Sequence, residues 1–407
     1  MNSNKKNNND KALKTISYAN KRAVMLITVS IIALTSLAIF IFYYFLVSRL
    51  DIAKKRDEPV YFSVLFLDEK NEPYGAYVGI ISSLHNRIGL IGLPRNISLW
   101  ENKNSVRSVP LSELYKNGGE SSVFRAIENS VDKPITYKIT IDNNGISDII
   151  DLIGGVEMYV EEPIEFEDKE RGYKLSFDIG EWLFTGDKVI SYLHYLRMKG
   201  YEDIETLYRL EDVIVNSMIG LIQNPELRTI IYSKDMRKSI PSHIKSNFRP
   251  PDIKAFFYIL ANSNERTLVI NNIDARFDDN GILTPIFDGS AFVKQMEDLT
   301  AYVELKTQKS ELNNEDVNLS VLNATDVAGL ADRINIRMRY RGFSAGEYGN
   351  FTTNLNESVV LVRDGQIEKA FMVANEGRVT RVYASTDRRV LNNAVLILGK
   401  DYYEITQ

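Results

Sequence analysis

The chain has 407 residues, 44% of them hydrophobic, and a formal net charge of −5. It has no cysteine and only three histidines, which excludes disulfides, thiolate metal sites and cysteine nucleophiles and disfavours a histidine-rich metal site. Residues 1–22 carry +5 and the remainder therefore carries −10, so we expect no nucleic-acid partner.

A long apolar segment follows the basic tail. Residues 23–48 carry no charge, and about 20 apolar helical residues suffice to span a membrane. A cleaved signal peptide usually has a shorter apolar run, about 7–15 residues. We therefore expect a disordered cytoplasmic tail at 1–22 and a single transmembrane helix at 23–48, with the bulk of the chain extracytoplasmic.

Strand and helix patterns alternate through the next part of the chain, which predicts an α/β sandwich with a central mixed sheet over 59–300. Strands are expected where β-branched and aromatic residues cluster, and helices where apolar residues recur every three to four positions. In chain order these are strands at 60–68, 75–82 and 87–94, a helix at 121–131, a strand at 134–142, a helix from 146 that ends at Gly154-Gly155, and a strand at 156–160.

A long amphipathic helix follows, closed by Asn224-Pro225. Its apolar stripe comprises Leu207, Leu210, Ile214, Met218 and Leu221. The polar stretch TQKSELNNEDVN then marks a break, which we place as a linker at 301–316. A small α/β domain is expected at 317–405, with strands at 317–322, 358–362 and 395–398 and helices at 329–340 and 367–375.

Several stretches resemble, in order, motifs of the LytR-CpsA-Psr family of envelope proteins. LFLDEK resembles a family strand ending in Gly-x-Asp-x-Arg, and IGLIGLPRNISL resembles the strand that leads into Ile-Pro-Arg-Asp. FTGDKVISYLHYLR and LYRLEDVIVNSMIGLI stand where the family has Gly-x-x-Ala-Leu-x-Tyr-x-Arg and Gly-Arg-x-x-Arg-Gln. VNLSVLNATDVAGLADRINIRMRYRGF resembles the small LytR-type domain often fused to its C-terminus. The common order behind one N-terminal anchor carries the resemblance.

The resemblance implies a polyprenyl-pyrophosphate-linked glycan held in an apolar pocket, with its phosphoglycosyl group transferred to peptidoglycan. Such chemistry uses guanidinium groups and a divalent cation to neutralise the pyrophosphate. Asp68 matches a family carboxylate that would hold Mg²⁺, although DEKNEP also suits a simple turn. Lys70 stands where the family often has Arg. Arg95 matches the arginine of Pro-Arg-Asp and would contact the pyrophosphate, unless it is merely solvated.

Other family positions are changed. Arg209 matches the first arginine of the later helix motif and would be catalytic together with Arg95, or it would pair with Asp212 three residues on. In the Tyr-x-Arg-x-Arg motif His194 replaces the first arginine, and Arg197 lies one residue beyond the second. Both are candidate phosphate ligands, and His194 also suits a structural role. A second family carboxylate has no counterpart.

Two functional hypotheses follow. The first is a single-pass protein of the cell membrane that binds a polyprenyl-phosphate glycolipid and transfers glycopolymer to peptidoglycan with Mg²⁺. The second is a non-catalytic relative that acts as an envelope scaffold and contacts peptidoglycan or another envelope component. A third interpretation, a transcriptional regulator facing the cytoplasm, lacks a basic recognition helix.

Overall fold

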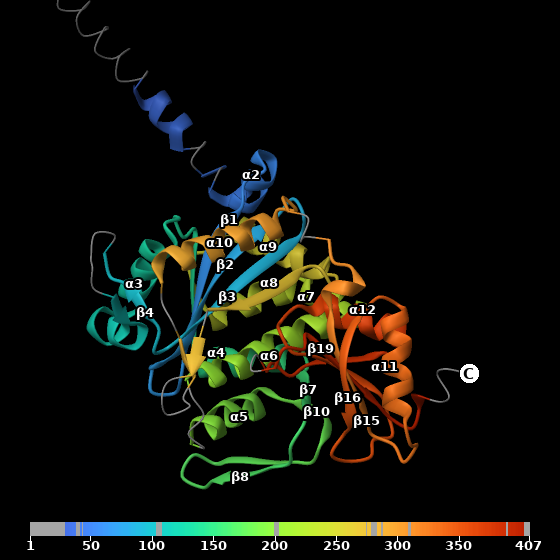
Figure 1. The fold of residues 1–407 in the computed structure, drawn as a ribbon. Helices are drawn as coiled ribbons and strands as arrows, with labels where there is room; N and C mark the ends of the chain where they lie inside the picture. The colour runs from blue at the N-terminus through green and yellow to red at the C-terminus, as the bar shows by residue number, and fades with distance from the viewer. Residues whose placement is uncertain are drawn as a thin grey trace, which may run out of the picture.

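The computed structural model describes residues 29–37, 41–42, 44–102, 108–198, 203–273, 275–277, 283–285, 288–307, 311–387 and 390–402. They form two α/β domains that lie against each other (Figure 1). The prediction of an α/β domain followed by a smaller α/β domain is therefore confirmed.

The first domain is built on a mixed sheet with the strand order β11-β6-β1-β2-β3-β12. The middle strand β2 runs antiparallel to both β1 and β3, and β6 and β12 add in parallel on the two sides. The strands are β1 (Val60–Leu67), β2 (Pro73–Ser82), β3 (Arg87–Pro94), β6 (Tyr137–Ile141), β11 (Lys245–Ser246) and β12 (Leu268–Asn272). Four of these strands were predicted, because their β-branched runs are long and compact.

Successive residues of the central strands point to opposite faces, and different helices cover the two faces. Leu65 and Val78 pack with α3 (Leu111–Val131) and α10 (Gly289–Val303). Phe66 and Tyr77 lie on the other face under a layer of shorter helices and one long one. That layer consists of α4 (Asn143–Leu152), α5 (Gly186–Met198), α6 (Asp203–Gln223), α7 (Pro225–Ile231), α8 (Lys234–Ser239), the 3-10 turn η1 (Ile240–His243) and α9 (Pro250–Ala261).

Helix α3 differs from its prediction at one end. Gly119 has φ of 62°, a left-handed conformation that interrupts the helix and that glycine adopts without steric cost. The part after this kink is the helix expected from Ser121 onward. The part before it, from Leu111, was not predicted from periodicity, because its sequence has no clear helical pattern.

Short hairpins extend from the sandwich. They are β4 (Ser98–Trp100) with β5 (Ser108–Pro110), β7 (Val156–Val160) with β10 (Gly180–Phe184), β8 (Ile164–Asp168) with β9 (Tyr173–Phe177), and β13 (Ala275–Phe277) with β14 (Leu283–Pro285). Of these strands only β7 was predicted. The β8–β9 hairpin matters for the candidate site described below.

The second domain has the strand order β16-β15-β19-β17-β18. Its elements are η3 (Asn314–Asp316), β15 (Asn318–Asn323), α11 (Leu330–Tyr340), β16 (Ser344–Asn350), β17 (Val359–Val362), α12 (Ile367–Gly377), β18 (Arg381–Ala384) and β19 (Ala394–Leu398). The three predicted strands and two predicted helices are present. The edge strands β16 and β18 are additional.

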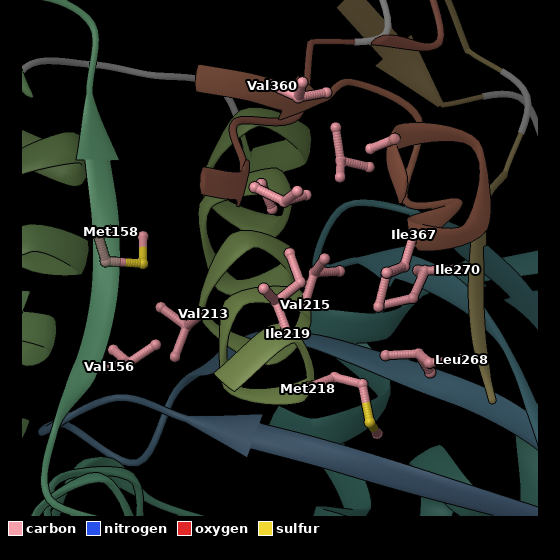
Figure 2. Close-up of a cluster of buried hydrophobic side chains, with 14 of the residues drawn as sticks. Val156, Met158, Val213, Val215, Met218, Ile219, Leu268, Ile270, Val360 and Ile367 are labelled. Atoms are coloured by element: carbon pink, nitrogen blue, oxygen red, sulfur yellow. The ribbon is translucent and has the colours of Figure 1, made fainter. Parts of the chain in front are cut away.

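The two domains share one buried core, with α6 at its centre. Figure 2 shows Val215 and Ile219 of α6 beside Ile270 of the first domain and Ile367 of the second. The backbones of the two domains are also hydrogen-bonded, since the amide of Ile270 donates to the carbonyl of Gly365 at 3.2 Å. Each domain therefore rests on the other through both apolar and polar contacts.

The N-terminal predictions are tested only in part. The tail at 1–22 and much of the expected span at 23–48 lie outside the described residues. Within the described ranges, no helix is both long and apolar enough to cross a membrane. Helical residues 29–37 and 44–46 project away from the first domain (Figure 1), and α2 (Arg49–Arg56) follows them and packs on α9.

Candidate functional site

The candidate polar residues gather where two strands end at one edge of the sheet. β1 and β3 are both antiparallel to β2, so they run in the same direction and their carboxyl ends share that edge. Asp68 follows β1 and Arg95 follows β3. Glu72 connects them, because it lies 3.7 Å from Arg95 and 3.7 Å from Arg197, and Arg197 in turn bonds to Asp68. The structure thus brings Asp68, Arg95 and Arg197 into one cluster.

Asp68 organises the turn between β1 and β2. Its Oδ1 accepts from the amides of Lys70 at 2.9 Å and Glu72 at 2.7 Å, and only 2% of the residue is exposed. Lys70 itself lies at the exposed tip of this turn. The turn role that the sequence suggested for Asp68 is therefore present, and it uses only one of the two carboxylate oxygens.

The other oxygen of Asp68 accepts a hydrogen bond from Arg197. Arg197 comes from the last turn of α5, and its guanidinium also lies 5.5 Å from the ring centre of Tyr74. Burial opposes the charge of Arg197, but the hydrogen bond to Asp68 and the nearby negative charges of Asp68 and Glu69 together outweigh burial and raise the pKa of Arg197. Arg197 reaches Asp68 although it lies one position beyond the family motif.

Arg95 is held more loosely than Arg197. Its guanidinium lies 3.7 Å from Glu72 and 3.7 Å from Asp203, which is longer than a hydrogen bond, and its side chain is 25% exposed. Asp203 begins α6 and was not predicted as a site residue. An acidic residue in the first turn of a helix is common, so its sequence position alone does not indicate a site. Burial raises the pKa of Asp203, and the nearby Arg95 and Arg197 oppose that rise. Arg95 can therefore exchange its carboxylate neighbours for an anionic ligand at little cost.

A second polar cluster lies next to the first and contains His194. Its Nε2 is 3.0 Å from Asp168, and its Nδ1 is 3.9 Å from Glu69. Asp168 closes the β8 strand, and Arg171 from the same hairpin bonds to it at 3.1 Å and lies 3.6 Å from Glu69. Desolvation opposes the charge of Asp168, but hydrogen bonds from Arg171, His194 and the backbone of the turn together lower the pKa of its carboxyl. His194 thus joins the hairpin to α5.

Arg209 lies at the contact between the domains. It pairs with Asp212 at 2.5 Å, as the helical spacing suggested, and also donates to the carbonyl of Thr386 in the second domain. Asp212 accepts from the amide of Thr386 at 2.7 Å, so the pair binds both backbone groups of that residue. The Asp212 carboxylate raises the pKa of Arg209 despite burial. Among the described residues, no hydrogen bond or ion pair joins Arg209 to Asp68 or Arg95.

An apolar cavity of about 320 Å³ lies between the sheet and the layer that contains α4, α6 and α9. Its walls are almost entirely hydrocarbon, and Ser217 is the one lining residue with a side-chain hydroxyl besides Tyr77. Phe62, Val64 and Phe66 alternate along β1 toward this cavity, and Asp68 lies two residues beyond Phe66. The cavity therefore underlies the strand whose end carries the polar cluster.

The prediction that Asp68 holds Mg²⁺ depends on free carboxylate oxygens. Asp68 already accepts two amides and Arg197, and across the part of the chain that the structure describes no three His, Asp or Glu side chains are placed to hold an ion. Mg²⁺ requires near-octahedral oxygen ligands. The arrangement does not fit a resident Mg²⁺, because a cation would first have to displace Arg197.

Comparison with known proteins gives two family matches. Residues 78–300 match the LytR_cpsA_psr family, and residues 316–402 match the family described as LytR cell envelope-related transcriptional attenuator. The first match covers the first domain from the middle of β2 onward, and the second covers the second domain.

Individual relatives are more distant. The polyisoprenyl-teichoic acid–peptidoglycan teichoic acid transferase TagU of Bacillus anthracis is 25% identical over 197 residues, 47% of this chain and 61% of that protein. TagV of Bacillus subtilis, with the same activity in its name, is 22% identical over 143 residues, 32% of this chain and 36% of that protein. The matched part of the chain thus spans less than two thirds of these relatives.

Solved structures of similar proteins include a crystal structure of Bacillus subtilis TagV and one of TagT bound to LIIa-WTA. The TagV structure has 16% identity and a TM-score of 0.47, with 60% of this chain and 98% of that one covered. The TagT structure has 13% identity and a TM-score of 0.43, with 61% and 92% covered.

Proposed function

Because the chain belongs to the LytR-CpsA-Psr family, we propose that it binds a polyprenyl-phosphate-linked glycan in the cavity between its sheet and α6. The observation that carries this proposal is an apolar cavity beneath β1, whose end bears Asp68 next to Arg197 and, through Glu72, Arg95. A hydrocarbon chain gains free energy by leaving water for such walls. The charged head of the same molecule would then meet two guanidinium groups at the sheet edge.

Arg95 would be the main phosphate ligand. Its present carboxylate neighbours are 3.7 Å away, so a phosphate can replace them without breaking a short hydrogen bond. Arg197 would bind the phosphate only if it released Asp68. Lys70 at the tip of the turn would add a point charge without a bidentate fork.

We propose further that the protein is held in the cell membrane by the apolar segment at 23–48, with both domains outside the cytoplasm. Ten described side chains in this segment, from Val29 to Leu46, are large, hydrophobic and at least 40% exposed. Peptidoglycan is the acceptor named in the relatives TagU and TagV, and it is our proposed acceptor or binding partner here.

Transfer of the glycopolymer is the finer part of the proposal, and one observation favours a non-catalytic relative instead. Asp68, expected to hold Mg²⁺, is hydrogen-bonded to Arg197, and Arg209, expected to be catalytic, donates to the carbonyl of Thr386, so both groups have structural partners. Mg²⁺ stays a prediction, and isothermal titration with and without the lipid would test it. We expect metal binding only when lipid phosphates complete the shell.

Binding by Arg95 variants tests the proposal. A hydrogen bond to a charged group contributes about 1.5–3 kcal/mol, so Arg95→Ala should weaken capture of a polyprenyl-pyrophosphoryl sugar about tenfold to hundredfold. Arg95→Lys should recover part of that loss, because it restores the charge but not the fork. Arg56→Ala, which removes an exposed arginine at the end of α2, is the matched control. Equal capture by the wild type and Arg95→Ala would refute the assignment.

A further inference from the structure

A second cavity lies between α2 and α9, on the far side of α9 from the apolar cavity. This α2–α9 groove has a volume of about 330 Å³. Leu46, Lys54, Tyr232, Lys254 and Tyr258 are among the residues that line it. It therefore combines two ammonium groups with two phenol rings and an apolar edge.

The groove has a rigid frame. Asp252 in the first turn of α9 is fully buried and accepts from the backbone and side chain of Arg49 at 2.7 and 3.0 Å. Arg249 bonds to the same carboxylate at 3.0 Å and to the carbonyl of Val47 at 3.2 Å. Burial alone would raise the pKa of Asp252, but hydrogen bonds from Arg249 and Arg49 lower it to about 2. α2 and α9 are thus fixed to each other by ionised groups.

The two lysines of the groove have no ion-pair partner in the described part of the chain. Both Lys54 and Lys254 are exposed. Asp51 is the one acid among the lining residues. Arg237 adds a cation next to the groove, because its guanidinium lies 4.5 Å from the ring centre of Tyr232. A phosphate group is the ligand that such a set of cations and phenols would attract.

The position of the groove indicates where that phosphate comes from. Leu46, at the groove's edge, is 67% exposed and ends the apolar helical residues that precede α2. If those residues lie in a bilayer, as our proposed function has it, the groove lies at the level of the lipid headgroups. The chain after residue 22 has a net charge of −10, so an anionic membrane surface would repel it unless local cations faced that surface.

We propose that the α2–α9 groove binds the phosphate headgroup of an anionic phospholipid of the surrounding membrane. The ammonium groups of Lys54 and Lys254 contact the phosphate, and Tyr258, which is 53% exposed, lies beside them at the lipid interface. Such binding would orient the first domain on the membrane, with α9 between the bound headgroup and the apolar cavity.

The test uses the full chain in a neutral detergent and native mass spectrometry to count bound lipids. Dihexanoyl phosphatidylglycerol is the probe, and dihexanoyl phosphatidylcholine and inorganic phosphate are the comparisons. A lysine near an anionic lipid surface changes affinity by about fivefold, so K54Q with K254Q should weaken phosphatidylglycerol binding by about 25-fold. The control pair K55Q with K238Q removes two exposed lysines that do not line the groove and should change binding less than twofold.

Four results would overturn the proposal: unchanged phosphatidylglycerol binding in the groove variant, an equal loss in the control pair, equal binding of phosphatidylcholine, or competition by inorganic phosphate at the concentration of the lipid. Capture of the polyprenyl-pyrophosphoryl sugar separates this proposal from the proposed function. The groove variant should keep that capture, whereas Arg95→Ala should lose it and keep phosphatidylglycerol binding.

Discussion

At the scale of single residues, the pairing of Asp68 with Arg197 decides how the site is arranged. The Asp68 side chain is fully buried, and among the described residues Arg197 is the one whose guanidinium bonds to it. Without that partner the carboxylate would keep only the two backbone amides. Arg197 therefore stabilises the folded site as well as offering a charge to a ligand.

Removing Arg197 should cost stability. Arg197→Ala leaves a buried carboxylate with one oxygen unbonded, so the free energy of unfolding should fall by about 1–3 kcal/mol. Asp68→Asn combined with Arg197→Ala should lose less than the sum of the two single variants, because the charge that needs a partner is gone. Urea unfolding followed by circular dichroism measures these differences.

The control for this prediction is Arg56→Ala, whose pair with Glu58 is 4.0 Å apart and exposed. That variant should change the free energy of unfolding by less than about 0.5 kcal/mol. If Arg197→Ala changed the free energy of unfolding as little as Arg56→Ala, the Asp68–Arg197 contact would not stabilise the fold.

Some of the site could be predicted from single residues and some could not. Asp68 and Arg95 were candidates because they match motifs of the family that the sequence resembles, and each directly follows a strand that its composition reveals. Arg197 was a candidate phosphate ligand, but its bond to Asp68 was not predicted, because a motif counts residues whereas α5 places residues three apart on one face. His194 and Arg197 share a face of α5 in this way, while Leu196 is buried in the core.

At the scale of elements, α6 connects the two domains through side chains on one face. Asn216 bonds to both backbone groups of Ala384, accepting from the amide at 2.8 Å and donating to the carbonyl at 3.2 Å. Arg209 and Asp212 do the same for Thr386, and Gln223 bonds to the carbonyl of Thr380 at 2.8 Å. These contacts occupy backbone groups along and beside the edge strand β18.

Loss of Asn216 should therefore loosen β18. Asn216→Ala leaves a buried amide and carbonyl unpaired, which costs about 1–3 kcal/mol, so amide exchange in Arg381–Ala384 should accelerate about tenfold or more. Amides in β3 should exchange at the wild-type rate, as should all amides in the exposed control Asn262→Ala, whose side chain donates to the carbonyl of Tyr258 in its own turn at 2.8 Å. Unchanged exchange in β18 would show that α6 does not hold the second domain in place.

The same elements show why sequence patterns found some strands and not others. β1, β3 and β19 are runs of apolar residues buried on both faces, a pattern that composition reveals directly. β16 is an edge strand with the sequence SAGEYGN, and most of its residues are exposed or half-buried. Its place depends on pairing with β15, which no local pattern records.

At the scale of the whole molecule, the sheet, the cavity and the second domain depend on α6. Leu207, Leu210, Met218 and Leu221 of its predicted stripe are buried, and Ile214, which lines the apolar cavity, is half-buried. The stripe could be predicted from spacing. The cavity beneath it could not, because its volume is set by helices that pack from distant parts of the chain.

The central claim is that this cavity holds the hydrocarbon chain of a polyprenyl-linked ligand while the sheet edge holds its phosphates. Ile214→Trp would fill part of the cavity from α6 without touching the polar cluster. Ile336→Trp adds the same bulk at a surface position on α11 that is 44% exposed, and it serves as the matched control. Urea unfolding should first establish that both variants are folded.

The most direct measurement compares binding of a polyprenyl-pyrophosphoryl sugar with binding of the same sugar diphosphate without a polyprenyl chain. We predict that Ile214→Trp weakens the long-chain ligand at least tenfold, about the loss of 1.4 kcal/mol of apolar contact, and leaves the chain-free ligand unchanged. Ile336→Trp should bind both as the wild type does. Undiminished long-chain binding by a folded Ile214→Trp variant would contradict the account.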